Sequence, residues 1–149
     1  MYKSILLYLI IPAIIYFDQL TKKIALSKLK AGKVVSCCRD IVKLTLVKNS
    51  GAAFGILKGR QLLLKIITVP LIVVMIYFLI YFTIPEIYVE IAFPLVFMLG
   101  GAVGNLIDRF RFNYVVDFFT LKFRGCPVFN IADIFIFIGA IIFAINTIF

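Results

Sequence analysis

Four long apolar stretches dominate the hydropathy pattern of the chain. They cover residues Ser4–Leu20, Leu62–Thr83, Val89–Leu106 and Ile131–Phe149. A helix needs about 17 to 25 predominantly apolar residues to cross the hydrocarbon core of a bilayer, so each stretch is long enough. The pattern predicts an all-α integral membrane protein with four transmembrane helices, forming a single domain over residues 1–149.

The connections between these stretches differ in length and pattern. The segment Thr21–Gln61 contains Lys43–Leu46, in which polar and apolar residues alternate as in a half-buried strand. It therefore predicts a small β-sheet at the membrane surface, between the first two helices. The short link Ile84–Tyr88 predicts a tight antiparallel hairpin of the second and third helices. In the last connection, Val115–Phe119 is also typical of a strand.

The first apolar stretch resembles a secretory signal at its start, because Lys3 precedes an apolar run. However, Asp18 and the pair Lys22 and Lys23 end this run without a cleavage site of small residues. We therefore expect the stretch to be retained as a membrane helix.

Composition restricts the partners and the chemistry. Of 149 residues, 64% are hydrophobic, and sixteen Lys and Arg against seven Asp and Glu give a net charge of +9. In so apolar a chain, this charge indicates anionic lipid headgroups as partners rather than nucleic acid. The chain has no His, which excludes Ser-His and Cys-His pairs and histidine metal sites. Cys37, Cys38 and Cys126 lack the spacing of metal ligands, so we expect no metal and no cofactor.

Polar residues gather on one side of the predicted membrane. Alternating spans place the end of the first helix, the end of the third and the start of the fourth on the same side. Of the sixteen basic residues, only Lys3 falls on the other side. Polar residues that converge at helix ends on one face indicate a functional site.

Four acidic residues lie in or beside the spans: Asp18, Asp108, Asp117 and Asp133. Ionisable groups at that depth cost a few kcal/mol on insertion scales, so they tend to be functional or paired. Lys22 and Arg109 can neutralise some of them, but not all four in simple pairs. We therefore expect at least one carboxyl group without a cationic partner.

Asp133 has a structural and a functional interpretation. Asn130 can be the N-cap of the fourth helix with Asp133 three residues on, as in a capping box. The positive end of the helix dipole can also hold Asp133 ionised for chemistry, and the two interpretations are compatible. Asp117 lies in an apolar, extended stretch. If the two carboxyl groups lie within about 3 to 5 Å, they share one proton and can activate a water molecule.

Glycines suggest close packing and turns. Gly100 and Gly104 have the small-xxx-small spacing that lets membrane helices approach closely, and this gives the neighbouring Asn105 access to the interior. The segment Asn49–Gly55 combines glycines with an aromatic residue, which by itself predicts no more than a turn.

Taken together, the polar segments resemble the ordered motifs of the lipoprotein signal peptidases, also called signal peptidase II. The motifs are Asp18–Lys22, Asn49–Phe54, Gly104–Arg109, Val115–Phe118 and Phe129–Asp133. Each is unspecific alone, but five in the same order in a four-span chain are highly specific. One departure is Ile134, where many relatives have Ser.

The resemblance implies that Asp117 and Asp133 are the catalytic pair of an aspartic endopeptidase. It implies that Asn105, Arg109 and Asn130 hold the site or contact the substrate. Further residues that it places in supporting or substrate-binding roles are Asp18, Lys22, Asn49, Gly51, Phe54, Asp108 and Ala132.

The resemblance also implies a substrate and a location. The substrate is a prolipoprotein whose cysteine already carries diacylglycerol, and the enzyme cuts just before this cysteine. We therefore expect a multi-pass monomer in the bacterial cytoplasmic membrane, with an extracytoplasmic active site and both termini in the cytoplasm. The positive-inside rule predicts the reverse orientation. We follow the resemblance, because the rule is statistical and weakens for long loops.

Two other functions fit parts of the pattern. A metal-dependent phospholipid headgroup transferase also gathers aspartates at a membrane face, but in closely spaced helical pairs. Here Asp108, Asp117 and Asp133 are nine and sixteen residues apart. A proton-coupled carrier needs acidic residues near the middle of its spans and an internal repeat, whereas these aspartates lie at span ends.

Overall fold

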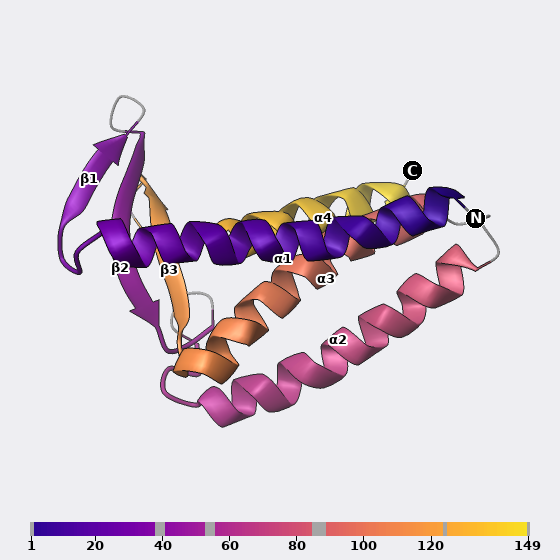
Figure 1. Cartoon of the computed structure of the whole chain (residues 1–149), viewed down its shortest axis with the longest axis horizontal. Helices are drawn as coiled ribbons and strands as arrows, with labels where there is room; N and C mark the ends of the chain where they lie inside the picture. Colours follow the sequence, from indigo (N-terminus) through magenta and orange to yellow (C-terminus); the bar gives the residue numbers. More distant parts are fainter. Residues whose placement is uncertain (1, 38–40, 53–55, 85–88, 124, 149) are drawn as a thin grey trace.

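The computed structural model describes residues 2–37, 41–52, 56–84, 89–123 and 125–148. Its helices are α1 (Tyr2–Lys28), α2 (Gln61–Thr83), α3 (Val89–Phe112) and α4 (Ile131–Ile148). Its strands are β1 (Val34–Cys37), β2 (Val42–Asn49) and β3 (Val115–Leu121). The helices extend from a small sheet at one end of the molecule (Figure 1).

Within these residues, three helices are long and apolar enough to cross a membrane: Gln61–Thr83, Glu90–Phe112 and Ile131–Ile148. The second, third and fourth predicted stretches begin at or next to the first residues of α2, α3 and α4. The transmembrane character of α1, which carries Asp18 and Lys22, stays a prediction. The predicted tight link at 84–88 lies largely outside the described residues, but α2 and α3 run antiparallel and pack together (Figure 1).

Two helices continue beyond their predicted apolar ends. Helix α1 reaches Lys28 rather than Leu20, and α3 reaches Phe112 rather than Leu106. The prediction stopped where charged residues begin, because these do not suit lipid. Both helices continue because the charged residues Lys22 of α1 and Asp108 of α3 form a buried salt bridge with each other.

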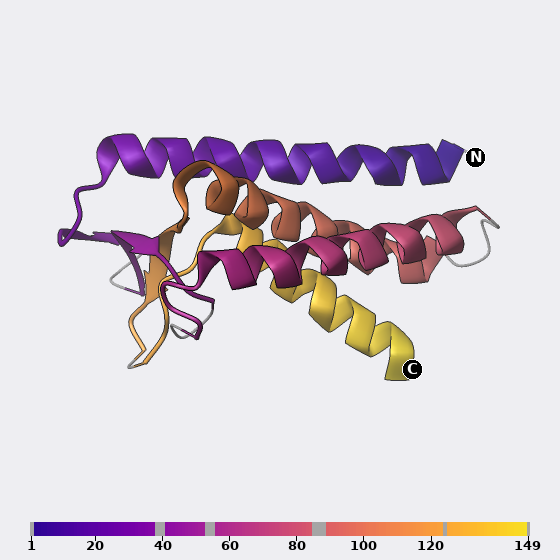
Figure 2. The same cartoon turned by 90° about the horizontal axis from the view of Figure 1, so that it is seen from below.

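Helix α3 is the centre of the bundle, because it packs against each of the other three helices. Its buried residues Val96 and Leu99 form the main hydrophobic core with Leu7 of α1 and with Met75 and Leu79 of α2. Figure 2 shows α4 running at an angle to α1 and α2, so it leaves the bundle towards the C-terminus.

Glycines bring the helices into close contact. At Gly104 an added Cβ would lie 2.6 Å from Oδ2 of Asp18, and at Gly100 2.9 Å from the Ile14 side chain. The predicted packing role of both residues is confirmed. Two further glycines act in the same way between α3 and α4: Gly101 abuts the carbonyl oxygen of Ala132, and Gly139 lies against that of Pro94.

The three-stranded sheet is antiparallel, in the order β1-β2-β3. Strand β2 contains the predicted Lys43–Leu46, and β3 contains the predicted Val115–Phe119. The sequence predicted a sheet between the first two helices, but β3 comes from the connection between α3 and α4. The register pairs Asn49 with Val115, which brings the end of β2 beside the start of β3.

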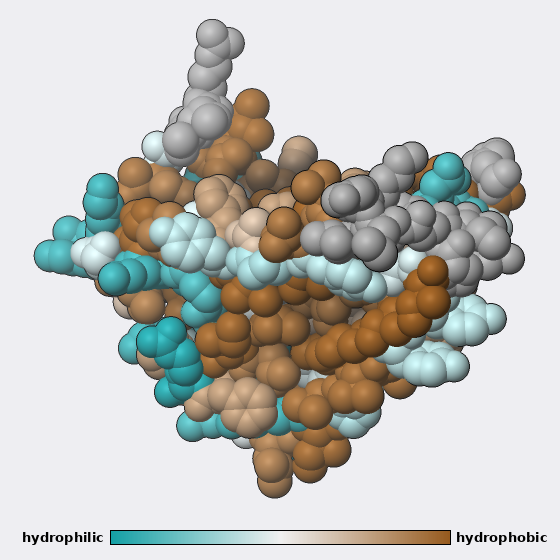
Figure 3. Space-filling model, turned by 45° about the vertical axis from the view of Figure 1, so that its right-hand side comes forward, coloured by the Kyte–Doolittle hydropathy of each residue, from teal (hydrophilic) through white to brown (hydrophobic). Residues whose placement is uncertain are grey.

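Hydrophobic residues cover most of the helical part of the molecule, whereas hydrophilic residues gather at the sheet end (Figure 3). On α2, the large side chains of Leu62, Val73 and Tyr77 are 72%, 60% and 62% exposed. So much exposed apolar surface is unusual for a protein in water and suits a lipid environment.

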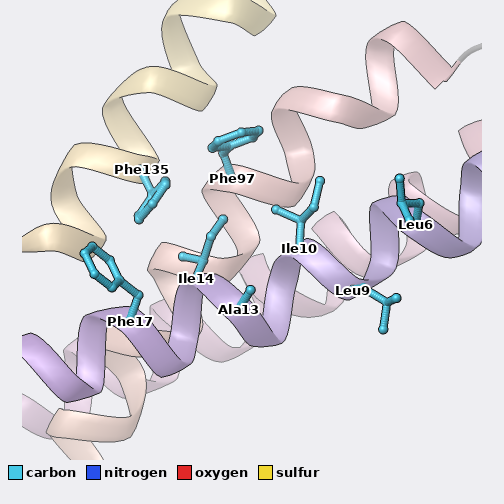
Figure 4. A pocket seen from close by; sticks show the side chains of 8 residues that line it. All are labelled: Leu6, Leu9, Ile10, Ala13, Ile14, Phe17, Phe97 and Phe135. Carbon is cyan, nitrogen blue, oxygen red and sulfur yellow. The ribbon is translucent and has the colours of Figure 1, made fainter.

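An apolar groove runs between α1, α3 and α4. Figure 4 shows Ile14 and Phe17 of α1 on one side, with Phe97 of α3 and Phe135 of α4 across from them. Its lining consists of apolar side chains, so the groove is suited to hydrocarbon chains.

Candidate active site

Asp117 is a buried carboxyl group in strand β3, with 2% of the residue exposed. Its Oδ2 accepts a hydrogen bond from Nδ2 of Asn49 at 2.9 Å, and its Oδ1 accepts one from Nδ2 of Asn130 at 2.7 Å. Burial and the negative charge of Asp133 raise the pKa of Asp117 to about 7, although the two amides act to lower it. Asp117 is therefore poised to gain or lose a proton near neutral pH.

Asp133 lies in the first turn of α4 and takes part in the predicted capping box. The Asp133 N–H donates to Oδ1 of Asn130 at 3.0 Å, and Oδ2 of Asp133 accepts from the Asn130 N–H at 3.1 Å. Its Oδ1 accepts a third bond, from Nδ2 of Asn105 at 2.8 Å. Two donors, the Asn130 N–H and the Asn105 amide, thus fix the orientation of this half-buried carboxylate at the positive end of the helix.

Two asparagines connect the aspartates. Nδ2 of Asn130, which bonds Asp117, also donates to Oδ1 of Asn105 at 3.1 Å. Asn105 in turn donates to Asp133. The amide groups satisfy each other and the carboxylates, so the pair is held by neutral donors rather than by cations.

Lys22 lies behind these amides and is 2% exposed. Its Nζ contacts Oδ2 of Asp18 at 2.8 Å and Oδ2 of Asp108 at 3.1 Å, and donates to Oδ1 of Asn105 at 3.0 Å. An ammonium group has three donors, and each has an oxygen partner here. Lys22 therefore fixes the orientation of the Asn105 amide, leaving Nδ2 free to point at Asp133.

Asp18 and Asp108 anchor the two elements that carry the candidate catalytic residues. Oδ1 of Asp18 accepts from the Ala132 N–H at 3.0 Å, at the start of α4. Oδ2 of Asp108 accepts from the Val116 N–H at 3.0 Å, next to Asp117. Both acids are buried and partnered, so of the four predicted acids only Asp117 and Asp133 lack a direct salt bridge among the described residues.

Arg109 follows Asp108 on α3 and is half-buried. Its positive charge interacts with the carboxyl groups of Asp133, Asp117 and Asp108. Its buried Nε has no hydrogen-bond partner in the part of the chain that the structure describes.

Gly51 and Phe54 were also predicted site residues. The Gly51 N–H donates to Oδ1 of Asn49 at 2.9 Å, which orients the Asn49 amide towards Asp117. Phe54 lies outside the described residues.

Sequence reasoning missed Gln19. Its Nε2 donates to Oδ1 of Asp108 at 3.0 Å and to the Gly104 carbonyl oxygen at 3.2 Å. Its place directly after Asp18 in a polar motif was the available signal. Gln61, also missed, donates to the Ser50 carbonyl oxygen at 2.5 Å and so holds the segment that follows Asn49.

The described residues contain no group of three or more His, Cys, Asp or Glu side chains arranged to hold a metal ion. The described acids lie instead against amides, backbone N–H groups and Lys22. This arrangement suits acid–base chemistry by carboxyl groups.

Comparisons with known proteins define the class of protein. The family described as signal peptidase (SPase) II matches residues 10–149. The lipoprotein signal peptidase of Halothermothrix orenii is 41% identical over 136 residues, covering 91% of this chain and 90% of that protein. That of Caldanaerobacter subterraneus is 41% identical over 133 residues, covering 89% of each.

Solved structures agree with the sequence comparisons. A bacterial membrane enzyme solved at 2.3 Å superposes with a TM-score of 0.86 and 30% identity, covering 99% of this chain and 88% of that chain. A second, solved at 1.9 Å, gives a TM-score of 0.83. The fold and the family define an aspartic peptidase of bacterial membranes. The chain belongs to the signal peptidase II family and removes signal peptides from prolipoproteins. The headgroup transferase has no support in these comparisons.

Proposed function

We propose that Asp117 and Asp133 are the catalytic pair and that they activate one water molecule between them. The observation that carries this proposal is their connection through Asn130 and Asn105, in a site where Asp117 has a pKa of about 7. A raised pKa beside a second carboxyl group is the arrangement in which one acid is protonated and the other ionised.

The pKa of Asp117 suggests how the proton is divided. Asp117 enters the reaction protonated, and Asp133 enters ionised at the helix N-terminus. Asp133 takes a proton from water as the oxygen attacks the scissile carbonyl carbon, while Asp117 gives its proton to the carbonyl oxygen. A neutral tetrahedral intermediate forms.

The second step restores both carboxyl groups. Asp133 gives its proton to the leaving nitrogen as the C–N bond breaks, and Asp117 takes the proton of one hydroxyl group as the C=O bond re-forms. The products leave with Asp117 protonated and Asp133 ionised, as at the start. No covalent bond to the enzyme is made.

The other site residues have supporting roles in this proposal. The carboxyl groups are oriented by the amides of Asn105, Asn130 and Asn49, which donate hydrogen bonds to them. Gly51 in turn holds the Asn49 amide. Lys22, Asp18, Asp108 and Ala132 hold the helices and strand that carry them. Arg109, whose positive charge interacts with both aspartates, contacts the substrate backbone.

The proposed substrate is a prolipoprotein with diacylglycerol on the cysteine that follows the cleaved bond. Acyl chains that stay in the bilayer hold the scissile bond at a fixed depth, which lowers the entropic cost of reaching the aspartates. The apolar groove in Figure 4 supports this proposal, because its lining is suited to hydrocarbon chains.

The proposed location is the bacterial cytoplasmic membrane. In this proposal α1 also crosses the membrane, which gives four spans in total. Both termini are cytoplasmic and the active site faces outward. The enzyme works as a monomer. The end of the molecule that carries the β-sheet and most of the basic residues lies against anionic lipid headgroups.

The substrate is tested with the purified protein in detergent. Incubation with a diacylated prolipoprotein should release the signal peptide, whereas the same precursor without the lipid should remain uncut. Equal cleavage of both precursors would contradict the proposed lipid recognition.

The orientation is tested in intact cells. Single cysteines placed between Lys28 and Lys48 should react with a membrane-impermeant maleimide from outside. Labelling only after the membrane is opened would place this segment in the cytoplasm and overturn the orientation.

A further inference from the structure

A second hollow, of about 500 Å³, lies between α1 and α3 at their polar ends. Its α1 wall includes Gln19, Lys22 and Lys23, and its α3 wall includes Asp108 and Arg111. Neither Asp117 nor Asp133 lines it, so the reaction described above does not account for it.

The charged groups at the bottom of this hollow are already satisfied. Lys22 and Asp108 are 2% and 1% exposed. Lys22 contacts three oxygen atoms, and the Asp108 carboxylate bonds Lys22, Gln19 and the Val116 N–H. The bottom of the hollow therefore offers no unpaired charge to a ligand.

The cations at its rim form no salt bridge within the part of the chain that the structure describes. Lys23 and Arg111 are both exposed. Neither forms a salt bridge with an acid in the described ranges. The Arg111 guanidinium group lies 5.1 Å from the Phe112 ring, in a cation–π contact. Two positive charges thus border the hollow without an acidic partner among the residues that the structure describes.

The remaining wall combines aromatic and apolar side chains. Tyr16, Leu20 and Leu26 of α1 line it, and they are 70%, 38% and 36% exposed. The predicted membrane span ends at Leu20. Tyrosine beside aliphatic residues, with basic residues next to them, is the composition found where a helix meets lipid headgroups.

We propose that this hollow binds the headgroup of one anionic phospholipid, with Lys23 and Arg111 contacting the phosphate. Tyr16 and Leu20 lie against the glycerol and the first carbons of the acyl chains. A zwitterionic choline headgroup binds less well, because its ammonium group is repelled by the two rim cations. This inference rests on the proposed function, which places this end of the protein at the membrane surface.

Native mass spectrometry of the purified protein in detergent tests the site, with phosphatidylglycerol or phosphatidylcholine added. The double variant Lys23→Gln, Arg111→Gln should bind phosphatidylglycerol about tenfold more weakly than the unmodified protein. The matched control is Lys28→Gln, Lys122→Gln, which removes two exposed basic residues that do not line the hollow. This control should keep most of the affinity.

A charge-conserving variant and a competition with inorganic phosphate distinguish a specific lipid site from diffuse attraction and from a free-anion site. The charge-conserving pair Lys23→Arg, Arg111→Lys should retain binding, and inorganic phosphate should not displace the lipid. Equal weakening by both neutral pairs would show diffuse attraction to a basic surface and overturn the site. Full displacement by inorganic phosphate would show a free-anion site and overturn the lipid assignment.

Because binding is measured without turnover, this test is independent of the catalytic proposal. The Asp117→Asn variant should bind the lipid like the unmodified protein. Cleavage of a lipidated precursor by Lys23→Gln, Arg111→Gln should be unchanged in detergent without added phospholipid.

Discussion

The side-chain amide of Asn130 donates a hydrogen bond of 2.7 Å to Oδ1 of Asp117. The same side chain accepts the N–H of Asp133 at 3.0 Å, so a residue that caps a helix also joins the two carboxyl groups. The first turn of α4 and strand β3 are thereby held together at the site.

Replacing either aspartate should stop the reaction without unfolding the protein. Asp117→Asn and Asp133→Asn each keep the shape of the side chain and remove a proton acceptor, so the cleavage rate should fall by at least about 10²- to 10⁴-fold. The measurement is release of signal peptide from a lipidated precursor, with thermal unfolding in detergent as the fold check. Glu90→Gln is the control, since Glu90 is an exposed acid on α3. Normal turnover by either Asn variant would refute the assignment.

Substitution of Asn130 tests its bond to Asp117. Asn130→Asp keeps an N-cap acceptor for the Asp133 N–H but loses the donor to Asp117 and adds a negative charge beside it. Its cleavage rate should be low, and its stability should also fall, because Asn130 is fully buried and the new carboxyl group lies beside that of Asp117. Asn130→Ala loses both functions and should also be destabilised by about 1 kcal/mol. If Asn130→Asp cleaved normally, the bond to Asp117 would have no catalytic importance.

Cleavage should depend on pH through Asp117. Because its folded pKa is raised from 3.8 to about 7, the group is protonated below about pH 7 and loses its proton above. The proposed mechanism needs that proton, so kcat/KM should fall as the pH rises through about 7.

Removal of Asn49 tests the origin of this pH dependence. The Asn49 amide bonds the ionised carboxylate and lowers the pKa of Asp117, so Asn49→Ala should move the fall in kcat/KM to higher pH. The check is a pH–rate profile of both proteins with the same precursor. A fall that moved to lower pH would contradict the assignment to Asp117.

Lys22 should matter mainly for stability. Lys22→Met removes the cation between two buried carboxylates, Asp18 and Asp108, and an uncompensated buried charge costs about 3–5 kcal/mol. Lys23→Met is the matched control, because Lys23 is exposed and should change stability by no more than about 0.5 kcal/mol. The comparison uses thermal unfolding of the two variants in the same detergent. Similar melting temperatures for both would argue against the buried ion-pair network.

Gly101 should be less replaceable than Gly100. A Cβ at position 101 would meet the Ala132 carbonyl oxygen, a backbone atom that cannot move without α4, whereas at position 100 it would meet the side chain of Ile14. Gly101→Ala should therefore lower both stability and cleavage, since Asp133 follows Ala132 on α4. Gly100→Ala should have the smaller effect on cleavage, as assayed with the lipidated precursor. A reversal of this order would contradict the packing described between α3 and α4.

Much of this protein follows from its sequence, because in lipid the backbone must satisfy its own hydrogen bonds and apolar length alone predicts a helix. The sequence also determined that acid–base chemistry falls to carboxyl groups, since the chain has no His. The capping relation of Asn130 and Asp133 was predictable because it is local: the two residues are three positions apart in the sequence.

Only the tertiary structure decided how distant groups meet. The pairing of Asn49 with Val115 across β2 and β3 brings the Asn49 amide to Asp117, and strand register does not follow from alternation in one strand. Likewise, no spacing rule places Lys22 against both Asp108 and Asn105, which lie on another helix. Their burial is favourable only because all the partners arrive together, so the end of α1 could be assigned as helix only once the fold was known.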